Sequence, residues 1–330
     1  MTETKKAENE VRPKREIEWF VMLFHLHLHV FGLYGIFIAL MEARFATFLF
    51  AIFTGCVSLL GVTAGAHRLW AHRSYTANLP LRIFLMLCQT SAGVGPIYDW
   101  VLNHRLHHKH KGTDNDPFNH KRGFFYSHFL SHMYSNSNNY EELVKGIDMS
   151  DIENDRVVMF QKRVYWLLMP ILTFLIPINA PIEYWGESVL NSVCVMGVLR
   201  YAVVLHTAWL VNSSLLIWGL QPENNFSFDT NWIFLVNLSY WPHYHYLLPW
   251  DYQTGEYGNY GSGLTTSFIR VCYALGWATE LKTIDSNSVK KAIETCVHSG
   301  KPLIDCLNSE GEKYSELLKQ NNIYETPDHF

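Results

Sequence analysis

Charged side chains are scarce in this chain of 330 residues: they make up 17% of it, whereas 48% of the residues are hydrophobic. So little charge is unusual for a water-soluble protein of this length. The formal net charge of −4 gives no general positive field, and the sequence contains no nucleic-acid-binding motif. We therefore expect no nucleic-acid partner.

The cysteines form no close pair. Six are scattered along the chain without a CxxC motif, so the sequence predicts neither a zinc ribbon nor a disulfide framework. The basic N-terminal segment turns apolar at Ile17 without a small-residue cleavage site, which predicts an uncleaved membrane anchor instead of a signal peptide. The sequence also lacks internal repeats and low-complexity segments.

Long apolar runs predict four membrane-spanning helices in two hairpins. A helix needs about 20 residues to cross a hydrocarbon core of roughly 30 Å. We place the spans at about residues 19–40, 45–63, 164–178 and 189–220, with a shorter interfacial or buried helix at 79–94. Lysine and arginine lie in both terminal regions and the middle segment, so the positive-inside rule puts both termini in the cytosol. The predicted fold class is an all-α membrane protein with a cytosolic, histidine-rich cap domain.

These features divide the chain into three parts. We interpret residues 1–16 as a cytosolic tail, 17–302 as the main domain and 303–330 as a polar C-terminal tail. An amphipathic patch at 268–281 belongs to the part that follows the last span.

Two histidine clusters predict a metal centre. His104, His107 and His108 have the i, i+3, i+4 spacing that places three side chains on one face of a helix. His67 and His72 are five residues apart, and they reach one face if the chain changes direction at the end of the second span. Neutral imidazole suits iron, copper, nickel or zinc. Polar groups beside lipid are costly unless they are satisfied, and a metal ion satisfies them.

Other histidines form weaker patterns. His243 and His245 are two apart after Pro242, so they point to different sides of a helix and leave open whether either is a ligand. His25, His27 and His29 lie on the first span, where we interpret them as packed or interfacial side chains.

The segments that carry these clusters support a family resemblance. Residues 61–75 and 104–109 resemble the first and second histidine boxes of membrane-bound acyl-CoA desaturases of the stearoyl-CoA type, particularly the insect branch. The resemblance covers about residues 17–302, with further matches at 114–117, 122–128, 147–151, 185–187, 209–213 and 276–278.

This resemblance implies a four-span protein of the endoplasmic reticulum membrane with a histidine-held di-iron centre. The implied reaction uses O2 to introduce a double bond into a saturated acyl chain, usually an acyl-CoA, with electrons supplied through cytochrome b5 and its reductase. The implied metal ligands are His67, His72, His104, His107, His108 and His245, with Asn212 acting through a water molecule. Trp100 and Trp209 match tryptophans that shape the acyl tunnel of the family.

Three positions at which the family has ligand histidines carry other residues here. Leu216 stands four residues after Asn212, and Pro242 and Tyr246 stand in the third box, where His243 substitutes only through a one-residue shift. An alternative hypothesis is therefore a catalytically impaired paralogue that binds lipid or a partner desaturase and regulates it. A third hypothesis keeps iron with altered chemistry, such as hydroxylation or a single metal.

Overall fold

The computed structural model describes residues 15–217, 244–255 and 260–321, and almost all of its regular structure is helical. The chain forms two compact units: residues 1–59 with 89–225, and residues 60–88 with 226–330. We call them unit 1 and unit 2 and describe each by itself.

Four helical segments are long and apolar enough to cross a membrane: Trp19–Met41, Phe45–Ala71, Arg156–Trp185 and Val189–Ser214. They confirm the four predicted spans and the all-α fold class. Large apolar side chains on the first span, such as Phe20 (83% exposed) and Leu33 (70% exposed), point outward. Exposed apolar surface of this extent is typical of a protein that contacts lipid.

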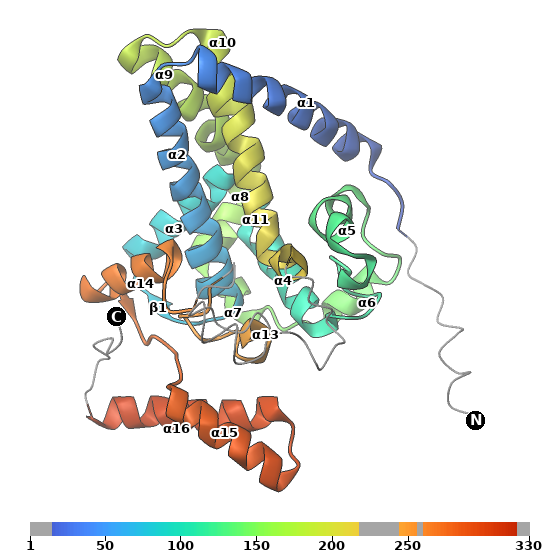
Figure 1. Cartoon of the computed structure of the whole chain (residues 1–330), viewed down its shortest axis with the longest axis vertical. Coiled ribbons are helices and arrows are strands. Elements are labelled where there is room, and N and C mark those ends of the chain that lie inside the picture. Colours follow the sequence, from blue (N-terminus) through green and yellow to red (C-terminus); the bar gives the residue numbers. More distant parts are fainter. Residues whose placement is uncertain (1–14, 218–243, 256–259, 322–330) are drawn as a thin grey trace. The chain divides into compact units, whose positions relative to one another are not determined.

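Unit 1 contains three complete spans and the larger part of the second span. It also contains the helices that follow the short apolar helix α3 (Leu79–Ala92), most of which belongs to unit 2. Figure 1 shows α2 and α11 running alongside each other. The elements are α1 (Trp19–Met41), α2 (Phe45–Leu60), α4 (Ile97–His110), η2 (His120–Arg122), α5 (Phe124–His128), η3 (Leu130–Met133), α6 (Tyr140–Lys145), α7 (Ser150–Glu153), α8 (Arg156–Met169), η4 (Pro170–Leu175), α9 (Ile176–Trp185), α10 (Val189–Ser192), η5 (Val193–Leu199) and α11 (Arg200–Ile217).

Close packing within unit 1 joins α1 to the last span. Ile38 of α1 is buried with Cys194, Val195 and Met196 of η5. A Cβ atom at Gly35 would lie 2.8 Å from the carbonyl oxygen of Cys194, so only glycine allows the two helices to approach this closely.

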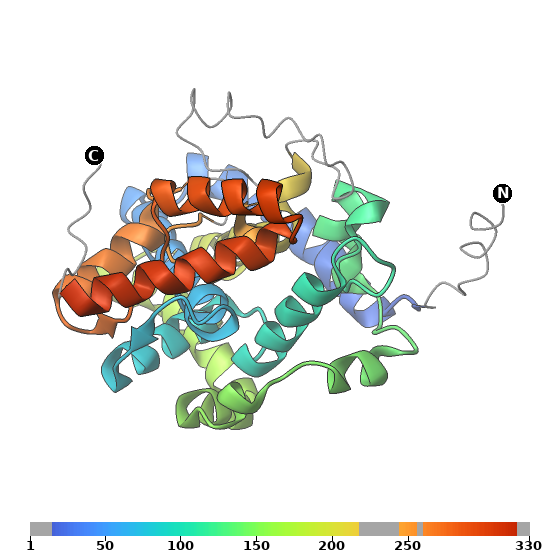
Figure 2. The same ribbon diagram turned by 90° about the horizontal axis from the view of Figure 1, so that it is seen from below.

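Unit 2 begins with the π-helix η1 (Gly61–Ala71), which continues directly from α2, and includes a short antiparallel pair, β1 (Thr76–Ala77) and β2 (Ala278–Thr279). Its helices are α13 (Tyr244–Leu247), α14 (Leu264–Ala274), α15 (Ser286–Ser299) and α16 (Leu303–Asn321). Figures 1 and 2 show α15 and α16 side by side as a helical hairpin.

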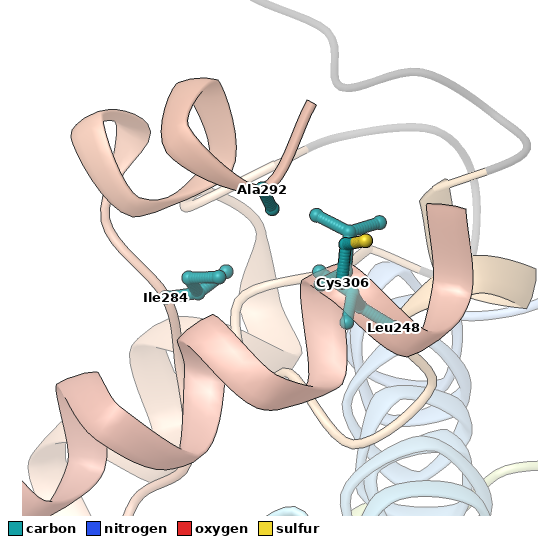
Figure 3. Close-up of a cluster of buried hydrophobic side chains, with 5 residues drawn as sticks. Leu248, Ile284, Ala292 and Cys306 are labelled. Carbon is teal, nitrogen blue, oxygen red and sulfur yellow. The ribbon is translucent and has the colours of Figure 1, made fainter. Parts of the chain in front are cut away.

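The C-terminal part differs from the expected polar tail beginning at residue 303, because α16 forms part of a hydrophobic core. Cys306 of α16 is buried in one cluster with Leu248, Ile284 and Ala292 (Figure 3), and Leu307 of the same helix also belongs to this cluster. The polar composition of this segment reflects its solvated face, while every third or fourth residue turns inward.

Candidate metal centre

Each unit contains a group of potential metal ligands. The ligands of unit 2 come from η1, its C-cap residue and α13, and those of unit 1 come from α4, α11 and the segment between α4 and α5.

In unit 2, the π-helix brings His67 and His72 together. The backbone N–H of His72 donates to the carbonyl oxygen of His67 over 3.1 Å, which is the i to i+5 bond of a π-helix. Residues five apart therefore lie on one face, and their rings are 4.7 Å apart between centroids. The change of direction expected from the sequence is this local widening of the helix.

His245 of α13 is the third imidazole of this group. Its ring centroid lies 4.8 Å from those of both His67 and His72, and its Nε2 is 3.2 Å from Nε2 of His67. Two nitrogens that bind one ion at about 2.0–2.1 Å lie about 3 Å apart. One ligand atom from each of the three residues lies within 4.8 Å of the others, so the group has the donors and spacing of a metal site.

Hydrogen bonds within unit 2 fix the orientation of η1. The guanidinium of Arg68 is buried and donates to the carbonyl oxygen of Tyr252 over 2.5 Å and to Oγ1 of Thr266 over 2.9 Å. Tyr75 donates its hydroxyl to the carbonyl oxygen of Ala64 over 2.9 Å. These bonds fix η1, which carries His67 and ends at its C-cap His72.

In unit 1, α4 carries His104, His107 and His108 as predicted. The ring centroids of His104 and His108 are 4.7 Å apart, and those of His107 and His108 are 5.7 Å apart. Nδ1 of His104 donates to Oδ1 of Asn212 over 2.8 Å, and Nδ1 of His107 donates to Oδ1 of Asp116 over 2.8 Å. A partner on one ring nitrogen fixes the tautomer and aims the other nitrogen, as in known metal sites.

Two buried residues near α4 were not predicted as site residues. Asp116 was identified only as part of a motif, and His120 was not identified at all. The structure places both with His107 in a second group whose ligand atoms lie within 4.8 Å of one another. The signal in the sequence was a histidine four residues after an aspartate, which is too common a pattern to identify a site.

The electrostatics of this group favour a charged carboxylate beside neutral imidazole. Burial alone would raise the pKa of Asp116, but the attraction and hydrogen bond of His107, with smaller contributions from His120 and the Phe118 N–H, hold it below its usual value. Burial, and then the neighbouring His107, lower the pKa of His120 to about 4. His120 is therefore neutral near pH 7, as a metal ligand must be.

The two tryptophans of the predicted acyl tunnel both contact histidines. Trp100 stacks on His104 at 5.0 Å between ring centroids, and Trp209 is buried and stacks on His132 at 4.5 Å. His25 also packs against Trp209, which agrees with the interpretation of the first-span histidines as packed side chains.

Two of the three positions at which the family has a ligand histidine and this chain has another residue lie within the described residues. Leu216 lies near the end of α11, and Tyr246 lies in α13 with its ring 5.6 Å from that of His245. Pro242 and His243 lie outside the described residues, so the one-residue shift stays a prediction.

Comparison with curated proteins gives several relatives that cover most of the chain. The chain is 43% identical over 295 residues to an acyl-CoA Delta-9 desaturase of Acheta domesticus, and the match covers 88% of this chain and 82% of the relative. It is 40% identical over 303 residues to an acyl-CoA Delta12-desaturase of the same species, with the same two coverages. It is 39% identical over 296 residues to the stearoyl-CoA desaturase of Homo sapiens, covering 88% and 81%. No protein-family model matches the sequence.

Proposed function

Because the chain belongs to the acyl-CoA desaturase family, we propose that it introduces a double bond into a saturated fatty acyl chain at a histidine-held iron centre. In the overall reaction, O2 takes two hydrogens from adjacent carbons, two external electrons and two protons, and leaves as two water molecules. Bound iron would supply the activation of O2 that attack on an unactivated C–H bond requires.

The proposed ligands are the histidines of both units. His67, His72 and His245 would hold iron in unit 2, and His104, His107 and His108 would hold iron in unit 1. The observation that carries the proposal is the convergence of His67, His72 and His245, since His245 is separated from His67 by 178 positions in the sequence. Three imidazoles with no carboxylate among them suit a transition metal better than calcium or magnesium.

The water-mediated role of Asn212 that the resemblance implies stays a prediction, and the side chain also supports a second role. Its side-chain oxygen accepts from Nδ1 of His104, so we assign it the orientation of that imidazole. Trp100 and Trp209 are proposed to line the acyl site, where flat apolar rings would exclude water from the reacting carbons.

The four apolar helices make the chain a multi-pass membrane protein. We propose that it resides in the endoplasmic reticulum with both termini in the cytosol, acts on acyl-CoA and takes electrons from cytochrome b5 and its reductase. A reaction that consumes external electrons at a membrane requires such a carrier.

Expression in a desaturase-deficient yeast that supplies cytochrome b5, followed by fatty-acid profiling, tests the function directly. We expect unsaturated products that are absent from the empty-vector strain and from a variant with His67→Ala. Normal expression in membranes without any new double bond would contradict the proposal. The regulatory paralogue is not favoured, because the histidines that remain converge and the relatives reported above are desaturases.

A further inference from the structure

A chain of hydrogen-bonded histidines in unit 1 lies outside the proposed iron ligands. Nε2 of His29 on α1 lies 2.7 Å from Nε2 of His206 on α11, and Nδ1 of His206 lies 2.9 Å from Nε2 of His128 on α5. The other ring nitrogen of His128, Nδ1, lies 2.9 Å from the hydroxyl oxygen of Ser213. These hydrogen bonds therefore link α1, α11 and α5 in one unbroken chain.

Both ends of this histidine chain meet backbone carbonyl oxygens. Nδ1 of His29 lies 2.5 Å from the carbonyl oxygen of His25, and Oγ of Ser213 lies 3.1 Å from that of Trp209. A carbonyl oxygen can only accept a hydrogen bond. Nδ1 of His29 and the hydroxyl of Ser213 must therefore supply the protons at the two ends.

The neutral groups carry one proton too few for this network. Three neutral imidazoles and one hydroxyl bring one proton each, four in all, whereas the network has five hydrogen bonds. In the neutral state one of the five therefore lacks its proton. A single additional proton completes all five, and because it can bind any of the three rings, it moves between them without the rotation of a ring.

We propose that His29, His206 and His128 relay a proton towards the acyl site. The inference rests on the proposed function, in which each turnover consumes two protons. A proton bound to Nε2 of His29 passes to Nε2 of His206 as one N–H bond breaks and the other forms, and Nδ1 of His206 then gives its proton to Nε2 of His128. Nδ1 of His128 hands a proton to Ser213, and each ring returns to its neutral form. Histidine chains serve as proton relays in other membrane proteins.

The inner end of the relay reaches residues that the proposed function uses. Trp209, a proposed wall of the acyl site, packs with its ring centroid 5.8 Å from that of His128. Ser213 directly follows Asn212, whose side chain orients His104. A proton that arrives at Ser213 is therefore beside the residues that hold substrate and ligand in place.

Exposure and electrostatics suit a relay that is neutral at rest. His29 and His206 are half-buried and His128 is buried, so the two outer rings are the ones open to an incoming proton. Burial, and then the neighbouring His206, lower the pKa of His128 to about 4, so this ring is neutral near pH 7 and releases a proton readily. Among the described residues, the other titratable neighbours are His25 of α1 and His132 of η3, and no carboxylate hydrogen-bonds to the three rings.

Hydrogen exchange at His128 tests the relay without turnover. In purified full-length protein labelled with ¹⁵N-histidine, NMR measures how fast the ring N–H of His128 exchanges with solvent. His206→Gln keeps an amide oxygen and an amide N–H for the two neighbouring rings, but an amide does not bind and release a proton near pH 7. We expect exchange to be about 10-fold slower in H206Q. Equal rates in H206Q and wild type would overturn the inference.

The matched control is His27→Gln on the same first span. His27 is exposed, and its Nδ1 bonds to the carbonyl oxygen of Leu23 instead of another ring. H27Q should exchange at His128 as wild type does. Slowing in H27Q equal to that in H206Q would contradict the relay, because any change on these helices would then have the same effect.

Steady-state kinetics with chemical rescue give a second test. In His206→Ala we expect kcat to fall about 100-fold at unchanged KM, and imidazole added to the buffer should raise it again by about 10-fold. Folded H206A whose lost activity imidazole does not restore would contradict the relay, since the ring would then only pack. Wild-type protein that forms no double bond would contradict the proposed function, whereas the exchange rates in H206Q would still decide whether the chain carries protons.

Discussion

At the scale of single residues, orientation of the imidazoles matters as much as their number. His104 and His107 each bind a partner through Nδ1, and those partners are Asn212 and Asp116. Such partners typically change metal affinity or activity by about 10- to 100-fold when they are removed. The histidine missing at position 216 is therefore one change within a network that holds the remaining ligands in place.

Restoring that histidine is the first prediction at this scale. Leu216 lies four residues after Asn212 on α11, so Leu216→His places an imidazole on the same helix face. We expect Fe²⁺ to bind about 10-fold more tightly or better, as measured by anaerobic titration. Leu216→Gln, which is polar but lacks imidazole, should bind as wild type. Equal binding by L216H and L216Q would show that position 216 does not face the metal.

At the scale of elements, the C-terminal hairpin supports the helix that carries His245. Leu248 directly follows α13 and is buried with Cys306 of α16 (Figure 3), and Leu307 of α16 belongs to the same buried cluster. A short stretch of backbone, from Leu248 back to His245, thus connects this hydrophobic core of unit 2 to a proposed metal ligand. Loss of this core should loosen α13 before it affects the spans of unit 1.

Leu307→Ala tests this connection. Removing a fully buried leucine side chain costs about 2–5 kcal/mol. We expect faster hydrogen exchange in α13, α15 and α16, together with weaker metal binding by unit 2. Leu317→Ala, at a position 54% exposed on the same helix, should leave both measurements unchanged. Unchanged exchange in L307A would mean that this core does not support α13.

The turns of the two membrane hairpins are also joined, through Glu187. Its Oε2 accepts from the Arg44 backbone N–H and the Thr47 hydroxyl, and its Oε1 accepts from Ser188 N–H and Asn191. Burial would raise the pKa of Glu187, but these four hydrogen bonds hold it below its usual value.

This depressed pKa predicts a pH-dependent stability. The charged form contributes fully above the unfolded pKa of about 4.3, and its contribution disappears as the pH falls through the lower folded pKa. Glu187→Gln should therefore cost roughly 1–3 kcal/mol at pH 7, because an amide nitrogen would face two donors, and the difference from wild type should shrink at pH 3. Thermal unfolding in detergent at both pH values measures this difference in stability, and Glu183→Gln, at an exposed position, is the control. A difference independent of pH would contradict the charge argument.

At the scale of the whole molecule, four apolar segments and the distribution of basic residues predict the topology. Both hairpin turns should face the lumen, and the C-terminal helices should face the cytosol. In intact microsomes, an impermeant maleimide should label Lys290→Cys, and it should label Glu42→Cys only after the membrane is permeabilised. The wild-type protein gives the background from its own cysteines. Labelling of E42C in intact microsomes would contradict the predicted topology, because residue 42 would then face the cytosol.

The sequence by itself determined the features that depend on local pattern. Apolar runs of sufficient length predicted the four spans, and the i, i+3, i+4 spacing predicted the ligand face of α4. Motifs around His67 and His104 were enough for the family, which the relatives confirm. These features are readable because hydropathy and helical periodicity act over a few turns of chain.

Only the tertiary structure decided which distant groups meet. The opening of η1 into a π-helix puts His67 and His72 on one face, and folding of unit 2 brings His245 to them across 178 positions. Burial lowers the pKa of His120, whereas the attraction and hydrogen bond of His107 hold the pKa of buried Asp116 below its usual value against the effect of burial. The sequence named the histidines, but packing selected their partners, since a hydrogen bond between remote residues leaves no periodic trace in the chain.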